Sequence, residues 1–206
     1  MVATPIGNAA DITLRALDIL ARVDAVACED SRVTGRLLVR HGVSAKLIPY
    51  HDHNAARALP ALMRRLKNGE SVALVSDAGT PLVSDPGYRL VRACIDDGIP
   101  VTAVPGASAV LTSLMVAGLP TDRFLFAGFL PNRRAARRRA LTEVADVPAS
   151  LVFMESARRL PASLADMADI LGPRSAAVTR EMTKMFEEVR RDDLAVLAAH
   201  YAEAGS

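Results

Sequence analysis

Short apolar runs alternate with one-sided apolar stretches along the first half of the chain. Runs of three to six residues rich in Val, Ile and Ala have the length of strands, and the stretches between them repeat apolar residues with the spacing of helices. Such alternation is typical of a mostly parallel sheet covered by helices on both faces. The expected strands are residues 2–4, 25–28, 46–50, 71–76 and 100–105. The expected helices are residues 14–20, 31–41, 55–67, 88–96 and 107–118.

The alternation resumes after a short segment rich in Gly, Pro and polar residues, GLPTDRF at 118–124, which has the composition of a linker. Beyond it, strands are expected at 124–130, 150–155 and 175–181, with helices at 132–145, 156–171 and 194–202. The proline in 46–50 indicates an edge strand. We therefore predict an α/β protein with two α/β domains, residues 1–118 and 119–206.

The segment SDAGTPLVSDPG, residues 76–87, follows an expected buried strand and contains two aspartates but no lysine or arginine. Asp77 and Asp85 would repel a phosphate at close range, so a phosphate-binding loop is disfavoured. The loop instead suits a ligand with an ammonium group, a sulfonium or ribose hydroxyls. Gly79 and Gly87 permit close approach or positive φ. The alternative is a pair of tight turns, with Asp85 capping the following helix.

Other polar segments also follow expected strands, where ligands bind in α/β sheets. PGAS at 105–108 places Ser108 either as a helix cap or beside a ligand. CEDSR at 28–32 offers Asp30 and Arg32, which are either a helix cap with its ion pair or site residues. YHDHN at 50–54 lacks a third ligand near its two histidines, so no metal site is predicted.

Five arginines lie within RRAARRRA, residues 133–140, on an expected helix. Five uncompensated charges indicate a surface that faces phosphates; the alternative is an ordinary solvated face. The predicted RNA contacts are Arg133, Arg134, Arg137, Arg138 and Arg139.

Length, composition, net charge and cysteine content exclude only a few classes of protein. The 206 residues are 50% hydrophobic with a net charge of +2, so any basic surface must arise from local clustering. Cys28 and Cys94 are far apart and outside any CxxC pattern, which favours two buried thiols. Neither a signal peptide nor an apolar stretch long enough to span a membrane is recognised. We expect a soluble cytoplasmic protein.

Several segments together resemble the ribosomal RNA small-subunit methyltransferase I family, a branch of the tetrapyrrole-methylase superfamily. They occur in the family's order over essentially the whole chain: VATPIGNAADIT, EDSRVTGRLL, ALVSDAGTPLVSDPGYRLV, VPGASAVLTSLMVAGLPTDRFLFAGFLP and VTREMTKMFEEV. The resemblance implies a homodimer of two-domain chains with S-adenosylmethionine in a cleft between the domains. It also implies methyl transfer to the ribose 2′-oxygen of a cytidine in small-subunit (16S) ribosomal RNA, free or in the 30S subunit.

Family positions carried onto this sequence predict the cofactor contacts Pro5, Asp77, Ala78, Gly79, Thr80, Val83, Ser108, Ala109, Met154 and Met182. Asp30 and Glu155 are the leading candidates for a general base, with His51 behind them. Arg32 or Arg180 is expected to hold the adjacent phosphate.

The chain departs from the family pattern at ESARR, where the family usually has Glu-Ser-Pro-His-Arg, so Arg158 replaces a histidine. We also expect the chain to lack the last strand of the second domain and a tail. Two other functions stay open: a tetrapyrrole-type methyltransferase acting on a small molecule, which the 4% aromatic content disfavours, and a non-catalytic RNA-binding ribosome assembly factor.

Overall fold

The computed structural model describes residues 1–204, and the chain divides into two compact units, Met1–Ala109 and Val110–Ser206. The division falls after the first residue of the small-residue helix α5 (Ala109–Ala117), which the sequence had grouped with the first domain. Among the described residues, no helix combines the length and apolar character that crossing a bilayer requires.

The first unit is built on a parallel sheet in the order β2-β1-β3, with β1 at Ala25–Cys28, β2 at Leu47–Pro49 and β3 at Val72–Val75. Val26 is in register with Leu47 on one side and with Ala73 on the other. The prediction that 46–50 forms an edge strand is confirmed. All four residues of β1 are buried, as expected for a central strand covered on both faces.

Residues 2–4 and 100–105 do not form the strands that the sequence predicted. They make only isolated bridges, parallel between Val2 and Val104 and antiparallel between Thr4 and Gly79. Pro5 and Pro105 directly follow the bridged residues, and a proline has no N–H with which to extend a ladder of hydrogen bonds. Residues 2–4 and Val104 are therefore buried without becoming part of regular strands.

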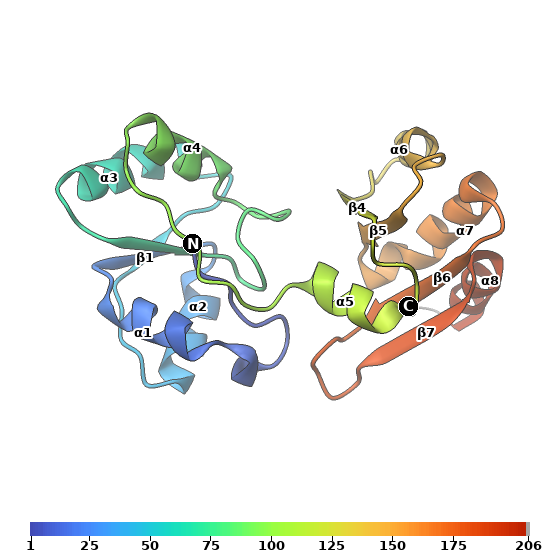
Figure 1. Cartoon of the computed structure of the whole chain (residues 1–206), viewed down its shortest axis with the longest axis horizontal. Helices are drawn as coiled ribbons and strands as arrows, with labels where there is room; N and C mark the ends of the chain where they lie inside the picture. The colour runs from blue at the N-terminus through green and yellow to red at the C-terminus, as the bar shows by residue number, and fades with distance from the viewer. Residues whose placement is uncertain (205–206) are drawn as a thin grey trace. The chain divides into compact units, whose positions relative to one another are not determined.

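Helices cover both faces of this sheet, as Figure 1 shows. On one face lie α1 (Leu14–Arg22) and α2 (Ser31–Arg40), and on the other α3 (Ala55–Lys67) and α4 (Tyr88–Asp96). Side chains of a strand alternate between faces, so Val26 and Cys28 belong to the core under α1 and α2, and Ala27 to the core under α3 and α4. Cys28 and Cys94 are free and buried, as predicted.

Two helix starts decide between alternatives that the sequence left open. Asp30 caps α2, since its side chain accepts a hydrogen bond from the Arg32 N–H. Asp85 does not cap α4; the N-cap is Gly87, which makes no side-chain hydrogen bond. The alternative in which Asp85 caps this helix is wrong, because Gly87 takes that position with a φ of 137°, and a Cβ there would lie 2.6 Å from Leu74 Cδ2.

The second unit contains two pairs of strands. The strands β4 (Phe124–Phe129) and β5 (Ser150–Met154) are parallel, with a register shift between Phe126 and Gly128. The strands β6 (Ser175–Arg180) and β7 (Glu188–Asp193) form an antiparallel hairpin. The sequence did not predict β7, because EVRRDD has almost no apolar residues and so lacks a strand's pattern.

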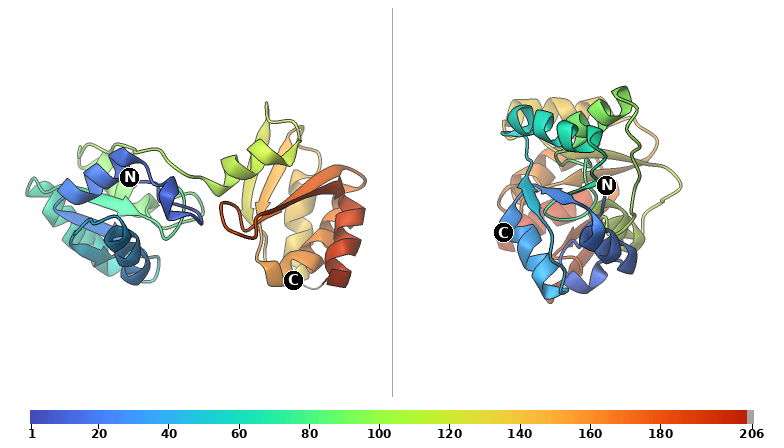
Figure 2. Two further views of the ribbon diagram at one scale, coloured as in Figure 1. Left: turned by 90° about the horizontal axis from the view of Figure 1, so that it is seen from below. Right: turned by 90° about the vertical axis from the view of Figure 1, so that its left-hand side faces the viewer.

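Helices also lie on both sides of these strands (Figure 2). The helices α6 (Arg134–Val144), α7 (Leu160–Leu171) and α8 (Leu194–Ala204) share one core with Leu151 and Val178. Thr179, next to Val178, points to the other face and donates from Oγ1 to Ser113 Oγ of α5 at 2.8 Å. The helix predicted at 156–171 is divided, since the 3-10 turn η2 (Ala157–Arg159) precedes α7.

Candidate functional site

Two loops of the first unit that are far apart in the sequence are joined at the carboxyl end of β3. Thr4 N–H donates to Gly79 O at 2.9 Å, and Gly79 N–H donates to Thr4 O at 3.0 Å. The Thr4 hydroxyl donates to Ser76 O at 3.1 Å from a fully buried position. The loop after residues 2–4 and the loop after β3 therefore form one fixed structure.

A third loop, containing PGAS, packs onto the same structure. Thr80 Oγ1 donates to Ala107 O at 3.1 Å. A Cβ on Gly106 would lie 3.0 Å from the Ala3 Cβ, and one on Gly79 would lie 3.3 Å from Ile6 Cγ2. Glycine at both positions thus permits the close approach of the backbones. We call this structure the loop cluster. It brings together the predicted residues Pro5, Asp77, Ala78, Gly79, Thr80, Ser108 and Ala109.

The turn that follows Gly79 holds two ordinary side chains in the left-handed region. Leu82 has a φ of 73° and Ser84 a φ of 62°. Between them Val83 is 42% exposed, and its N–H donates to Thr80 O at 3.4 Å. Such conformations cost free energy and occur most often at ligand-binding or catalytic sites. This strain is a signal that the amino-acid sequence did not carry.

The loop cluster is acidic, and the one cation near it, Arg32, interacts with the charge of Asp77 but is paired with Asp30. Asp77 Oδ1 accepts a hydrogen bond from the Asp30 N–H at 2.9 Å, which joins the loop after β1 to the cluster. Burial raises the pKa of Glu29, and Asp77 and Asp85 raise it further. Burial likewise raises the pKa of Asp85, together with Asp77 and Asp52. Within residues 1–204, no Lys or Arg forms an ion pair with Glu29, Asp77 or Asp85. The cluster is suited to a cationic ligand.

Asp30 and Arg32, both predicted catalytic residues, form a pair with each other. Arg32 Nε and Nη2 lie 3.0 and 2.6 Å from the Asp30 carboxylate oxygens. The hydrogen bonds from the Arg32 side chain and backbone lower the pKa of Asp30 to about 2. A carboxylate with such a low pKa is a weak proton acceptor at neutral pH. The geometry favours a capping and orienting role for Asp30.

Glu155, the other predicted base, is held by neighbours in the second unit. Its side chain is 5% exposed and lies 3.0 Å from Arg159 Nη2. Ser163 Oγ donates to Glu155 Oε2 at 2.6 Å, and Ser156 N–H donates to Glu155 Oε1 at 2.8 Å. These contacts use both carboxylate oxygens, so the geometry favours a structural role that fixes η2 and the start of α7.

The remaining predicted contacts of the second unit lie at the ends of β5 and β6. Met154 is the half-buried last residue of β5, and Met182, after β6, is 9% exposed. Arg180 lies 3.7 Å from Glu188. The hydroxyl of Thr183, the residue after Met182, is buried without a hydrogen-bond partner, and its φ is 66°. An orphaned polar atom on a strained backbone is a ligand-contact candidate.

The five arginines of RRAARRRA do not form an uncompensated surface. Arg134, Arg137 and Arg138 all contact Asp166, at 3.1, 2.7 and 3.1 Å, and Asp166 is 1% exposed. Burial opposes ionisation of Asp166, but the hydrogen bonds from these arginines outweigh it and lower its pKa. The prediction of uncompensated charge is therefore wrong. Arg137, itself buried, is structural.

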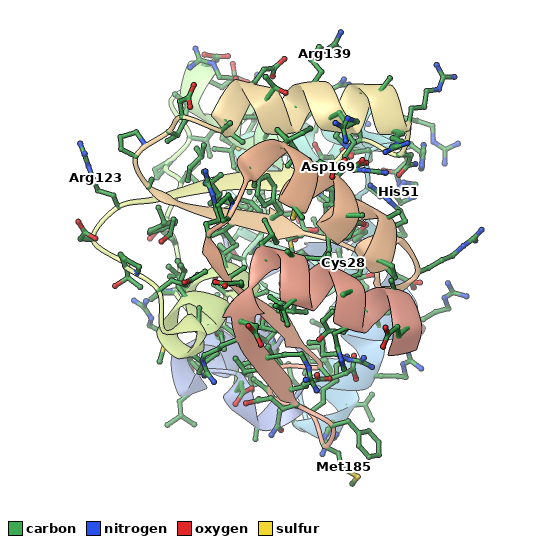
Figure 3. The ribbon with its side chains drawn as sticks, turned by 90° about the vertical axis from the view of Figure 1, so that its right-hand side faces the viewer. Cys28, His51, Arg123, Arg139, Asp169 and Met185 are labelled. Carbon is green, nitrogen blue, oxygen red and sulfur yellow. The ribbon has the colours of Figure 1, made fainter. Side chains whose placement is uncertain are left out.

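Other members of this set remain at the surface. Arg139 projects from α6 away from the protein, 3.9 Å from Glu143, while Arg138 also binds Asp169 at 2.9 Å (Figure 3). Arg133 immediately precedes α6 and is exposed. In the described part of the chain, no group of three His, Cys, Asp or Glu residues is placed to hold a metal ion. The His51 and His53 rings lie 6.0 Å apart.

Comparison with known proteins gives the family. Residues 1–198 match the tetrapyrrole (corrin/porphyrin) methylases. The chain is 57% identical over 205 residues to the ribosomal RNA small subunit methyltransferase I of Mesorhizobium japonicum, covering 99% of this chain and 70% of that protein. It is 47% identical to the protein of that name from Escherichia coli O157:H7, covering 98% of this chain and 71% of that protein. The relative from Micromonospora olivasterospora, 50% identical over 97% of this chain, is covered over 64% of its length.

Solved structures share the fold at much lower identity. The structure of diphthine synthase matches 96% of this chain and 82% of its own with a TM-score of 0.74 and 17% identity. The cobalt precorrin-4 methyltransferase structure matches 99% of this chain and 89% of its own with a TM-score of 0.70 and 18% identity. The match over residues 1–198 and the relatives at 47–57% identity show that this chain belongs to the tetrapyrrole methylases and, within them, to the ribosomal RNA small subunit methyltransferase I group.

Proposed function

We propose that this methyltransferase uses S-adenosylmethionine to methylate the ribose 2′-oxygen of a cytidine in small-subunit ribosomal RNA. The relatives' names support the RNA substrate. The observation that carries the choice of methyl donor is the group of carboxylates at and beside the loop cluster: Glu29, Asp77 and Asp85 lie near one another, and none of them forms an ion pair among the described residues. We also propose that the protein is cytoplasmic and forms a homodimer.

The residues of the loop cluster fit this donor chemically. Its ammonium, sulfonium and ribose hydroxyls are the groups that carboxylates bind well, and the glycine at position 79 lets the loops that carry these carboxylates pack closely. The predicted contacts in the first unit are Pro5, Asp77 to Thr80, Val83, Ser108 and Ala109. Met154 and Met182 stay predicted contacts from the second unit. When bound, S-adenosylmethionine supplies a methyl group on a positively charged sulfur, a good leaving group.

The chain's own task is then to position the ribose and accept its proton. Arg32, held by Asp30, is placed to bind the neighbouring phosphate. Asp30 and Glu155 were the predicted bases, but Asp30 has a pKa of about 2 and both Glu155 oxygens are occupied. Glu29, beside Asp30 and with a raised pKa, is the carboxylate of this segment best able to take a proton.

The base assignment predicts unequal effects of two isosteric substitutions. Glu29→Gln should lower kcat by about 100-fold or more while methyl-donor binding persists, because a positioned base typically contributes that factor. Asp30→Asn should have a smaller effect on kcat and should raise KM for RNA, since it releases Arg32. Single-turnover methylation at several pH values measures both; equal losses of kcat, or none for Glu29→Gln, contradict the assignment.

The function itself is tested by incubating the chain with labelled S-adenosylmethionine and unmethylated small ribosomal subunits, then mapping the modified nucleoside by mass spectrometry. Label on a cytidine ribose is expected; label on a base, or only on an added small macrocycle, overturns the proposal. Calorimetry with S-adenosylmethionine and with uncharged S-adenosylhomocysteine tests the donor site. Asp77→Asn/Asp85→Asn should weaken binding of the sulfonium form more than that of the neutral form. Equal weakening contradicts a charge-based contact.

A further inference from the structure

A line of three arginines runs along the solvent face of α2. Arg32, Arg36 and Arg40 are spaced four residues apart and all are exposed. Four residues advance a helix by slightly more than one turn, so the three side chains share one face over about 12 Å. The residues that α2 buries, Thr34 and Leu38, point the opposite way. We call these three residues the α2 arginine stripe.

The α2 arginine stripe differs from the arginines of α6 in its lack of acidic partners. The helix SRVTGRLLVR contains no Asp or Glu. Arg32 binds the N-cap Asp30, but Arg36 and Arg40 have no side-chain hydrogen bond or ion pair within the described residues. On α6, by contrast, Arg134, Arg137 and Arg138 converge on Asp166.

The helix gains nothing from this arrangement by itself. Like charges four residues apart repel each other, and a cation in the first turn opposes the helix dipole. Only Arg40, in the last turn, lies where the dipole favours a positive charge. Local rules are most often broken where a residue serves binding. The α2 arginine stripe is therefore a stronger candidate for an external anion than the mostly neutralised arginines of α6.

The α2 arginine stripe also begins at the candidate site. Its first member, Arg32, is held by Asp30, and the Asp30 N–H donates to Asp77 of the loop cluster at 2.9 Å. Both contacts lie within the first unit. A polyanion lying along α2 would therefore end next to the residues proposed to bind the methyl donor.

We propose that the α2 arginine stripe binds consecutive phosphates of the RNA strand that carries the target ribose. This inference rests on the proposed RNA substrate. Guanidinium groups pair with phosphate oxygens in a fork geometry, and such contacts set position along the strand without reading its sequence. Arg32 orients the phosphate next to the reacting ribose, and Arg36 and Arg40 hold the strand beyond it.

The test compares two double variants of the full chain that each remove two unpaired, exposed arginines. Arg36→Ala/Arg40→Ala alters the α2 arginine stripe. Arg57→Ala/Arg64→Ala is the matched control, because these residues of α3 are also exposed, have no ion pair within the described residues and cover the other face of the sheet. Binding of unmethylated small ribosomal subunits is measured across a salt series, with S-adenosylmethionine affinity and thermal unfolding alongside.

The stripe variant should bind subunits roughly tenfold more weakly, with the salt dependence of log Kd reduced by about 1.5, because each lost phosphate contact removes close to one released counterion. Its KM should rise with kcat near that of the unaltered chain, and its cofactor affinity should not change. Unchanged subunit binding, or an equal loss in the α3 control, overturns the inference while the unaltered enzyme still methylates. If the unaltered enzyme neither binds nor methylates subunits, the proposed function fails instead.

Discussion

At the scale of single residues, the candidate site depends on glycines and carboxylates that are costly to the fold. Gly79 has a φ of 81° and lies against Ile6, and Asp85 has a pKa raised by burial and by other carboxylates. Leu82 and Ser84 hold positive φ without being glycine. These residues lower the stability of the folded protein, and residues of that kind are typical of binding sites.

Gly79→Ala tests whether the close packing of the loops matters for binding. The new Cβ would combine positive-φ strain with contact at 3.3 Å from Ile6 Cγ2, so we expect a loss of about 2 kcal/mol in unfolding free energy and weaker methyl-donor binding. Gly42→Ala is the matched control, since Gly42 has a φ of 67° and nothing within 4 Å of its Cβ position. It should cost about 1 kcal/mol and leave donor binding unchanged. Urea unfolding and calorimetry measure both, and normal donor binding by Gly79→Ala contradicts the role of the loop cluster.

At the scale of elements, most helix boundaries follow from the sequence, because the apolar spacing ends where a helix-terminating Gly or Asn-Gly occurs. The helices Ala55–Lys67 and Tyr88–Asp96 were predicted with the same ends, since one-sided apolar spacing stops at Asn68-Gly69 and Gly98. The strand Glu188–Asp193 was not predicted, because its residues are mostly charged. It is a strand because it pairs with β6, and the sequence pattern does not show that pairing. The strand predicted at residues 100–105 was wrong for the opposite reason. The run is apolar, but Pro105 has no N–H to donate the next hydrogen bond of a strand ladder.

The same limit applies to the site. The sequence alone predicts that SDAGTPLVSDPG follows a buried strand and that this loop is acidic. Asp166 binds three arginines that lie 28 to 32 residues earlier in the chain. The sequence could not predict these contacts, because they depend on how α6 and α7 pack. Side-chain partners on different elements are set by tertiary structure. Counting the arginines of α6 alone therefore overestimated how many of them are free to bind RNA.

Asp166 is the residue on which the packing of α6 against α7 depends. Asp166→Ala should lower the unfolding free energy by about 3–5 kcal/mol, because the buried Arg137 would lose its counter-charge. Asp169→Ala is the control: its side chain is 59% exposed, and its partner Arg138 keeps Asp166, so the expected change is within about 0.5 kcal/mol. Urea unfolding distinguishes the two, and similar small changes for both substitutions would show that Asp166 is not a packing centre.

At the scale of the whole molecule, carboxylates with raised pKa values occur beside the loop cluster of the first unit, whereas the buried Asp166 of the second unit has a lowered pKa. In the first unit, Glu29 and Asp85 have raised pKa values, because burial and neighbouring carboxylates disfavour their charge. In the second unit, Asp166 has a lowered pKa, because three arginines stabilise its charge. The core of each unit is separate, so each unit's stability can be followed on its own.

These shifts predict different pH dependence in the two units. A group with a raised pKa takes up its proton at a higher pH in the folded state than in the unfolded state, so Glu29 and Asp85 should make the first unit more stable as pH falls from 7 to 5. Asp24 and Asp30 of the same unit have lowered pKa values, and their contribution stays nearly constant over this range because it is lost only as pH falls below their ordinary value of 3.8. Asp166 of the second unit acts in the same sense as Asp24 and Asp30: its contribution is present above pH 3.8 and is lost only as pH falls through its lower folded value. Over pH 7 to 5 the contribution of Asp166 to the second unit's stability should stay constant.

Methyl NMR during urea unfolding reads the units separately, through Leu62 in the first core and Leu164 in the second. The Leu62 midpoint should rise between pH 7 and pH 5, and the Leu164 midpoint should not. Asp85→Asn removes one of the raised groups, so it should stabilise the first unit at pH 7 and reduce the pH dependence of the Leu62 midpoint. A Leu62 midpoint that falls on acidification, or an Asp85→Asn protein less stable at pH 7, would mean that the carboxylates of the loop cluster are not held at a cost to the fold. The case for a cation as their natural partner would then be lost.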